Sequence, residues 1–167
     1  MSTSESTYTP TLTIIGGGPG GYEAALVAAK LGAQVTVVER KGMGGAAVLT
    51  DVVPSKTLIA TADSMRRVQR AAQLGVDLGD VEPRARMSEV DHRILQIAGE
   101  QSRDIEADLE RRGVRIVRGR GRVVGPHQVQ VTPEGAEEPS ETLTCDAILV
   151  SVGASPRELP TAKPDGE

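Results

Sequence analysis

The sequence predicts an α/β fold: a parallel sheet containing a βαβ unit, then a helical insertion and a small antiparallel β-meander. TLTII (11–15) is a short β-branched run that stops at a glycine cluster, as a buried parallel strand does. Residues 20–32 have helical spacing and end at a glycine, and QVTVVE (34–39) is a second strand. From residue 114 onward, apolar residues instead alternate with a period of two. These three observations set the fold class.

The middle of the chain is predicted to be mostly helical. Residues 46–72 suit a helix that is broken or restarted at Pro54. Residues 75–87 are rich in glycine and proline and indicate a loop. A long charged helix with one apolar stripe is expected over 87–113.

The last third is predicted to consist of short strands. Four of them are expected to form the antiparallel meander: 114–119, 122–124, 128–131 and 141–145. A continuous apolar strand over 146–156 then ends in a glycine turn. We expect this last strand to return beside the first one.

The composition excludes several classes of function. At 167 residues the chain has the length of one domain. It has no Trp, no Phe and two Tyr, and its net charge is -4, so neither aromatic base stacking nor a basic footprint supports nucleic-acid binding. The sequence has no apolar run near the roughly 18 residues that span a bilayer, no basic signal-peptide segment and a single cysteine. We therefore expect a cytoplasmic protein without a nucleic-acid partner or an integral membrane segment.

The glycine cluster carries the strongest functional signal. Gly16, Gly18 and Gly21 match G-x-G-x-x-G between a strand and a helix, and the acidic Glu39 ends the next strand. Gly16 permits the tight turn, Gly18 lets a pyrophosphate approach the backbone, and Gly21 lets helix and strand pack closely. The helix N-terminus favours the phosphates, and Glu39 can accept hydrogen bonds from ribose hydroxyls. The pattern predicts a Rossmann-like dinucleotide site; the alternative is a tight turn that binds nothing.

Further motifs carry a resemblance to a known family. GGGPGGYEAALVAAKLGAQVTVVER resembles the FAD-binding start of the pyridine-nucleotide disulfide oxidoreductases, such as dihydrolipoamide dehydrogenase. Gly44, Gly45, Pro54, Ser55 and Lys56 match the ends of a family pattern that normally contains two cysteines. SVGASPREL (151–159) resembles a second FAD contact, and RGRG (118–121) resembles the stretch whose backbone meets the adenine. The resemblance covers nearly the whole chain.

The resemblance implies an FAD site and a domain plan. We expect residues 1–10 to be a flexible tail, 11–159 the first part of an incomplete FAD-binding domain, and 160–167 the start of a linker to an NAD(P)H-binding domain. Beside Gly16, Gly18, Gly21 and Glu39, the residues expected to bind the cofactor are Pro19, Gly20, Arg40, Gly44, Gly45, Ala46, Ala47, Lys56, Gly119, Arg120, Gly121, Ser151, Val152 and Gly153. Val152 replaces the family's threonine, so a hydroxyl contact there falls to Ser151 or to the backbone.

The two cysteine positions decide the expected chemistry. They are Ala47 and Val52 here, so no redox disulfide can form. In this the chain is most similar to the dithiol-lacking NAD(P)H-quinone reductases of actinobacteria, which implies hydride transfer from NAD(P)H through FAD to a quinone-type acceptor. The resemblance also implies that this is an N-terminal fragment, inactive alone, of a homodimeric enzyme. A dihydrolipoamide-dehydrogenase-like disulfide reductase and a non-catalytic nucleotide-binding module remain as alternatives.

Lys56 is the candidate catalytic residue. The matching lysine of the family lies near flavin N5 and O4, where its charge would stabilise the reduced, anionic flavin. His92 and His127 are expected to be solvated, and Cys145 to be a small buried hydrophobe. No metal site is expected.

Overall fold

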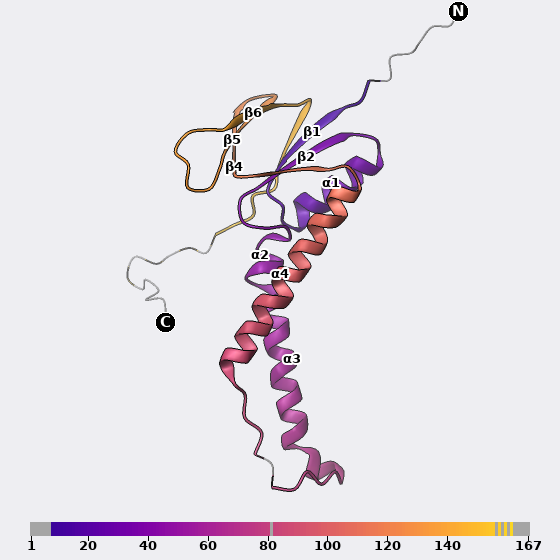
Figure 1. Cartoon of the computed structure of the whole chain (residues 1–167), viewed down its shortest axis with the longest axis vertical. Coiled ribbons are helices and arrows are strands. Elements are labelled where there is room, and N and C mark those ends of the chain that lie inside the picture. The colour runs from indigo at the N-terminus through magenta and orange to yellow at the C-terminus, as the bar shows by residue number, and fades with distance from the viewer. Residues whose placement is uncertain (1–7, 81, 156, 158, 160, 162–167) are drawn as a thin grey trace, which may run out of the picture.

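The computed structural model describes residues 8–80, 82–155, 157, 159 and 161. Its strands are β1 (Thr11–Ile15), β2 (Gln34–Glu39), β3 (Arg115–Arg118), β4 (Arg120–Gly125), β5 (Gln128–Thr132), β6 (Glu141–Thr144) and β7 (Ala147–Val150). Its helices are α1 (Pro19–Lys30), α2 (Gly45–Leu49), α3 (Val52–Gln69), a 3-10 turn η1 (Ala71–Leu74) and α4 (Met87–Arg111). The predicted α/β class is confirmed, as are the restart of the helix near Pro54 and the long charged helix (Figure 1).

A four-stranded parallel sheet in the order β3-β2-β1-β7 forms the centre of the fold. β1 pairs with β2 on one side, with Ile14 opposite Val37, and with β7 on the other, with Ile14 opposite Leu149. The expected return of the last strand beside the first is confirmed. β7 is shorter than the apolar run predicted over 146–156, because the chain leaves the sheet after Val150.

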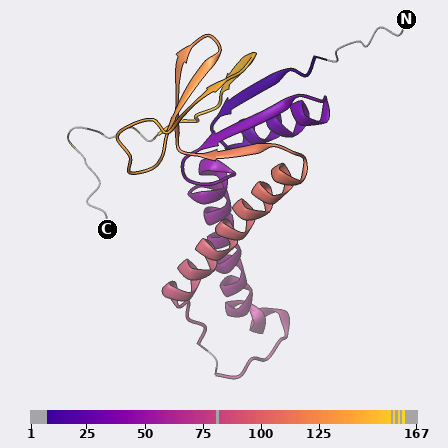
Figure 2. The same cartoon turned by 45° about the horizontal axis from the view of Figure 1, so that its top comes forward.

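The two faces of this sheet bury different partners because successive side chains of a strand point to opposite faces. Ile14 and Val37 pack with α1 and α4, where Leu109 is fully buried. Ile15 and Val38 pack instead with side chains of the antiparallel sheet β4-β5-β6. Figure 2 shows that sheet standing apart from the helices. The parallel sheet is thus covered on both faces, as its continuous apolar strands require.

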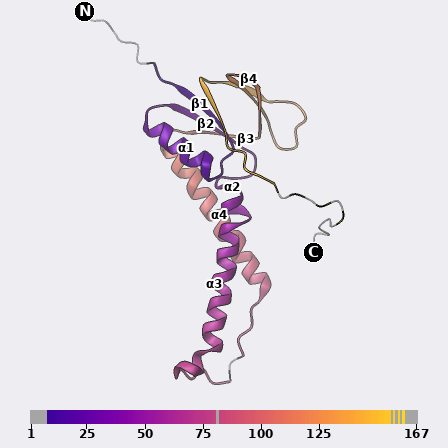
Figure 3. The same cartoon turned by 180° about the vertical axis from the view of Figure 1, so that it is seen from behind.

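The helices α3 and α4 form a long hairpin that projects from the sheet (Figures 1 and 3). One side of α4 is buried along its length, where Val90, Ala98, Ser102 and Leu109 follow one another at helical spacing. Figure 3 shows the short α2 at the junction between the sheet and the base of the hairpin.

One predicted strand belongs to the other sheet. Residues 114–119 were expected in the meander, but β3 pairs in parallel with β2, with Ile116 opposite Val37. Only β4, β5 and β6 form the antiparallel sheet. The chain passes from β3 to β4 at Gly119, whose φ of 152° allows the change of direction. Residues 1–7 of the expected tail, and all of the expected linker 160–167 except Thr161, lie outside the described residues.

Candidate functional site

The glycine cluster forms the turn between the carboxyl end of β1 and the start of α1. Gly16 has a φ of 104°, and its amide donates to the carbonyl of Val38 at 2.8 Å. α1 begins at Pro19 with Gly18 as N-cap, and neither a capping side chain nor an acidic residue occupies its first turn. The positive end of the helix dipole therefore lacks an anionic partner from its own helix. This arrangement suits a phosphate group.

The three glycines of the motif differ in the space around them. A Cβ on Gly16 would lie 2.2 Å from the carbonyl oxygen of Ser151, and a Cβ on Gly21 would lie 1.9 Å from that of Gly16. A Cβ on Gly18 would instead find Gly45 Cα as its nearest neighbour, 3.9 Å away. The first and third glycines are therefore required by packing, whereas the space beside Gly18 is open to a ligand.

The Glu39 carboxylate organises the turn from the end of β2. Its Oε2 accepts a hydrogen bond from the Gly17 amide at 2.7 Å, and its Oε1 accepts from the amides of Lys41 at 2.7 Å and Gly42 at 3.4 Å. Each carboxylate oxygen offers two lone pairs, so Oε2 retains capacity for another donor such as a ribose hydroxyl. The sequence indicated Glu39 as a ligand for ribose, but not as the residue that holds the glycine turn.

The loop after β2 brings a second glycine pair against the first. The Gly44 amide donates to the carbonyl of Gly17 at 2.8 Å, and a Cβ on Gly45 would lie 2.8 Å from Gly18 Cα. Met43 is fully buried below this contact, and a Cβ on Gly17 would lie 2.5 Å from its Sδ. The sequence analysis did not identify Met43 as part of this site. The feature that could have indicated its burial is that it is a single apolar residue within a glycine-rich loop.

The carboxyl end of β7 completes this edge of the parallel sheet. The Ser151 amide donates to the carbonyl of Ile15 at 2.8 Å. A Cβ on Gly20 would lie 3.0 Å from Ser151 Oγ, so this hydroxyl lies beside the first turn of α1. Val152 is 66% exposed, and Gly153 is exposed with a φ of 69°. Ser151 therefore offers a hydroxyl beside the glycine turn, whereas Val152 can offer only its backbone.

The RGRG stretch lies where β3 passes into β4. Gly119 is buried, and a Cβ there would lie 2.7 Å from the carbonyl oxygen of Thr132. A Cβ on Gly121 would lie 2.9 Å from Ile15 Cγ2, so packing alone requires glycine at both positions. Arg120 between them is exposed.

The remaining predicted residues lie on α2, on α3 and after β2. Ala46 is exposed and Ala47 half-buried on α2, and Arg40 is exposed directly after β2. Lys56 is exposed in the second turn of α3, four residues after Val52, and its ammonium makes no salt bridge with a described residue. Within the part of the chain that the structure describes, no salt bridge joins Lys56 to the glycine turn.

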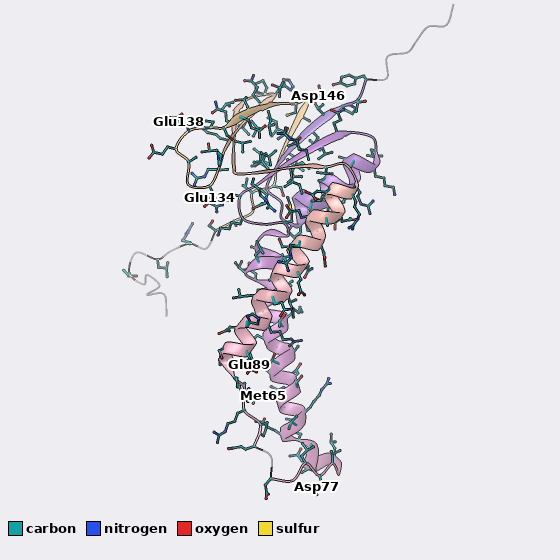
Figure 4. The ribbon with its side chains drawn as sticks, in the orientation of Figure 1. Met65, Asp77, Glu89, Glu134, Glu138 and Asp146 are labelled. Carbon is teal, nitrogen blue, oxygen red and sulfur yellow. The ribbon has the colours of Figure 1, made fainter. Side chains whose placement is uncertain are left out.

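Two cavities lie between helices, away from the glycine turn. One of about 230 Å³ separates α1 from α4 and includes Tyr22 and Asp108 in its lining. The other, of about 450 Å³, lies between α3 and α4, with Met65 and Glu89 on facing helices (Figure 4). The glycine turn is an open surface cradle, distinct from both.

The histidines and the cysteine lie away from this cradle. His92 is exposed on α4. His127 is also exposed, and its Nδ1 lies 3.1 Å from the carbonyl oxygen of Cys145, which is itself buried. Over the described ranges, no cluster of three or more His, Cys, Asp or Glu residues is arranged to hold a metal ion. None of the helices in that part of the chain has the length and apolarity to cross a membrane.

Comparison with known proteins identifies the relatives of this chain. The family profile described as pyridine nucleotide-disulphide oxidoreductase matches residues 10–166. An NAD(P)H dehydrogenase (quinone) of Mycobacterium tuberculosis is 41% identical over 165 residues, which cover 93% of this chain and 33% of that protein. A dihydrolipoyl dehydrogenase of Chlorobaculum parvum is 33% identical over 156 residues, covering 93% and 32%.

A solved structure supports the same relationship. The crystal structure of LpdA from Mycobacterium tuberculosis matches this fold with a TM-score of 0.86 and 40% sequence identity, covering 95% of this chain and 35% of that one. This chain therefore spans about a third of the length of the relatives it matches. The resemblance inferred from the motifs is confirmed: the chain belongs to the pyridine nucleotide-disulphide oxidoreductase family.

Proposed function

We propose that this chain is the FAD-binding part of a longer NAD(P)H oxidoreductase that passes electrons to a quinone-type acceptor. The observation that carries the proposal is the glycine cradle at the carboxyl end of the parallel sheet, where Gly18 borders open space and Glu39 holds the turn. The relative named NAD(P)H dehydrogenase (quinone), which matches 93% of this chain, supports this choice of reaction.

The residues of the cradle fit the pyrophosphate and ribose of FAD. The first turn of α1, with Pro19 and Gly20, would receive the pyrophosphate beside Gly18, with the Ser151 hydroxyl next to it. Glu39 would accept from the ribose hydroxyls through its remaining lone pairs. The other expected contacts are the backbone or side chains of Arg40, Gly44, Gly45, Ala46, Ala47, Gly119, Arg120, Gly121, Val152 and Gly153.

The domain plan follows from the same proposal. Residues 11–159 would be the first part of the FAD domain, with 1–10 as a tail and 160–167 leading to an NAD(P)H-binding domain. Relatives three times as long leave room for that domain. We expect the complete enzyme to be a cytoplasmic homodimer.

Lys56 is proposed as the catalytic residue of this chain. When bound, FAD takes up a hydride from NAD(P)H and returns two electrons to the acceptor. By the family resemblance, the ammonium of Lys56 would lie beside the reactive ring and would stabilise the negative charge of the reduced form. Lys56→Met keeps an apolar stem and removes the charge. We expect it to retain FAD but to slow flavin reduction by about 10²- to 10³-fold, the usual effect of losing one preorganised charge partner. Stopped-flow absorbance measures this rate; an unchanged rate would reduce Lys56 to a surface residue.

The reaction is tested in the full-length protein. Denaturation followed by chromatography should release FAD, and FMN alone would overturn the cofactor assignment. NADH should then bleach the flavin, and a quinone should restore its absorbance. No long-wavelength band of a thiolate–flavin pair should form, because positions 47 and 52 are Ala and Val.

A disulfide reductase is the second candidate, since dihydrolipoyl dehydrogenases are among the relatives. This chain contains one cysteine, Cys145, whose sulfur is buried beside His127. It therefore offers no dithiol for that reaction. Turnover of lipoamide that resists thiol-blocking reagents would contradict our choice. FAD binding without reduction by NADH would favour the third reading, a non-catalytic nucleotide-binding module. Failure to bind any dinucleotide would favour a tight turn that binds nothing.

A further inference from the structure

Helix α4 contacts both of the segments that hold Glu39. Ser102 is buried, and a Cβ on Gly42, in the loop after β2, would lie 3.0 Å from Ser102 Oγ. One turn further along α4, Glu106 forms a salt bridge with Arg118, the last residue of β3. Residues spaced i, i+4 lie on the same side of a helix, so one side of α4 supports both segments.

The loop after β2 orients the carboxylate of Glu39. The amides of Lys41 and Gly42 donate to Glu39 Oε1 at 2.7 Å and 3.4 Å. Gly42 packs closely against two side chains, since a Cβ there would lie 3.0 Å from Ser102 Oγ and 3.2 Å from Leu49 Cδ1. The buried Ser102 therefore bounds the loop that carries both donors.

The crossing from β3 to β4 holds the main chain at Glu39. The Gly119 amide donates to the Glu39 carbonyl at 3.0 Å, and Arg118 lies opposite Glu39 in the parallel pairing of β2 with β3. The salt bridge with Glu106 ties this crossing to α4. The side chains of Arg118 and Glu106 remain 45% and 27% exposed, and ion pairs this open contribute little to global stability. The main effect of the salt bridge is therefore local, on the position of Arg118 and the glycine after it.

We propose that Ser102 and Glu106 are positioning residues for the adenosine half of FAD. This rests on the proposed function, in which Glu39 binds the ribose and residues 118–121 meet the adenine. Ser102 acts through the loop after β2, and Glu106 acts through Arg118; neither side chain binds the cofactor itself. Both determine the affinity for the nucleotide and leave electron transfer at the flavin ring unchanged.

The first test removes the charge of Glu106 in the full-length protein. Glu106→Gln keeps the shape of the side chain but breaks the salt bridge with Arg118. Asp108→Asn is the matched control, because Asp108 lies on the same helix and forms salt bridges with Arg111 and Arg112 at its end. Fluorescence titration of the full-length apoprotein measures the Kd for FAD. This Kd should rise about three- to ten-fold in Glu106→Gln and stay unchanged in Asp108→Asn, while both variants keep similar urea midpoints.

Two further readouts separate positioning from a general structural role. The Kd for ADP, which contains the adenosine half without the flavin, should rise by the same factor as the Kd for FAD. The rate of flavin reduction by NADH at full FAD occupancy should not change. In an Arg118→Gln background, Glu106→Gln should have no further effect, because the connection between α4 and the nucleotide is already broken.

The second test concerns the contact between Ser102 and Gly42. Gly42→Ala places a Cβ against Ser102 Oγ and should raise the Kd for FAD about three-fold. Adding Ser102→Ala removes that oxygen and should restore most of the affinity. A loss of affinity that arose within the loop alone would not be relieved by a substitution on α4.

The outcomes distinguish this proposal from the proposed function. Equal Kd values for FAD in Glu106→Gln and Asp108→Asn would overturn the role of Glu106. Failure of Ser102→Ala to rescue Gly42→Ala would overturn that of Ser102. Slower flavin reduction in either set would also contradict the proposal, since the effect would then reach the ring. A wild-type protein that binds no FAD, or one that NADH does not bleach, would instead refute the proposed function itself.

Discussion

The two ends of the β1–β7 strand pair differ in how their polar groups are hydrogen-bonded. At the amino end, Asp146 Oδ2 accepts from the Thr11 amide at 2.7 Å and from its hydroxyl at 2.6 Å, and the Asp146 amide donates back to Thr11 Oγ1 at 2.9 Å. At the carboxyl end, Gly16 and Ser151 are held by main-chain hydrogen bonds, and their neighbour Gly18 faces open space. One end satisfies its polar groups within the chain, and the other leaves helix amides and space available.

This difference shows where a parallel sheet can acquire function. Thr11 and Asp146 are 135 residues apart in sequence and act as a clamp that fixes β7 beside β1. With that end closed, the carboxyl end can be made of glycines, which contribute little to stability by themselves but allow close approach of backbone and ligand. The largest expected effects are therefore at the carboxyl end, and the smallest at the clamp.

Gly21→Ala should give the largest loss of stability. Its Cβ would lie 1.9 Å from the carbonyl oxygen of Gly16, so α1 must move away from β1. We expect the free energy of unfolding of the apoprotein to fall by about 3 kcal/mol, at the upper end for overpacking, measured by urea denaturation. A stability equal to wild type would show that α1 is not held against β1 as described.

Gly18→Ala is the matched control at the same turn. Its backbone angles, φ -69° and ψ -179°, are open to any residue, and its Cβ would have no neighbour closer than 3.9 Å. We expect stability within about 0.5 kcal/mol of wild type, because no contact is lost. FAD occupancy should nevertheless fall, and Gly18→Val, which is larger, should abolish binding. Full flavin occupancy in Gly18→Val would show that the pyrophosphate lies elsewhere.

Glu39→Gln separates the two roles of the acidic residue. The NH₂ group of glutamine would replace one carboxylate oxygen and so face donors: either the Gly17 amide at the Oε2 position, or the amides of Lys41 and Gly42 at the Oε1 position. Loss of one hydrogen bond to a charged group should lower the unfolding free energy of the apoprotein by about 1.5 to 3 kcal/mol. Denaturation without FAD measures this effect alone. If only FAD affinity changed, Glu39 would bind ribose without organising the turn.

The sequence was sufficient to predict the βαβ unit and the glycine turn, because both depend on local patterns. Gly16 is set by its positive φ and by close packing and Gly21 by close packing alone, whereas Gly18 borders space for a ligand. Glu39 follows as the acidic end of the next strand. The hydrogen bond from the Gly17 amide to Glu39 was not predicted. It depends on how the loop after β2 packs against the glycine turn, where Met43 lies next to Gly17.

The position of β3 could not be predicted for a related reason. RIVR alternates like a strand of the meander, and alternation identifies a strand without identifying its partner. Its partner β2 lies more than seventy residues earlier, and the pairing is parallel. As an edge strand of the parallel sheet, β3 keeps Arg115 and Arg118 exposed, so it lacks the continuous apolar pattern of the buried strands.

The smallest effect is expected at the clamp, and only in acid. The Thr11 hydroxyl and then the Tyr8 hydroxyl donate to Asp146, which lowers the pKa of its carboxyl from 3.8 to about 2. The pKa of Asp146 is lower in the folded state than in the unfolded state. The carboxylate therefore stabilises the fold at pH values above 3.8, and this contribution is lost as the pH falls toward 2. Asp146→Asn should therefore be less stable than wild type at neutral pH and should lose less stability across that window.

The measurement is urea denaturation at several pH values, with a second variant to correct for other carboxyl groups. Glu134→Gln removes a carboxyl from the exposed loop between β5 and β6, well apart from Asp146 (Figure 4). Its stability should follow the wild-type pH dependence, so the difference between the two variants isolates the clamp. Parallel pH curves for wild type and Asp146→Asn would mean that the Thr11–Asp146 hydrogen bonds do not favour the charged carboxylate. The closed end of the sheet would then owe its stability to packing alone.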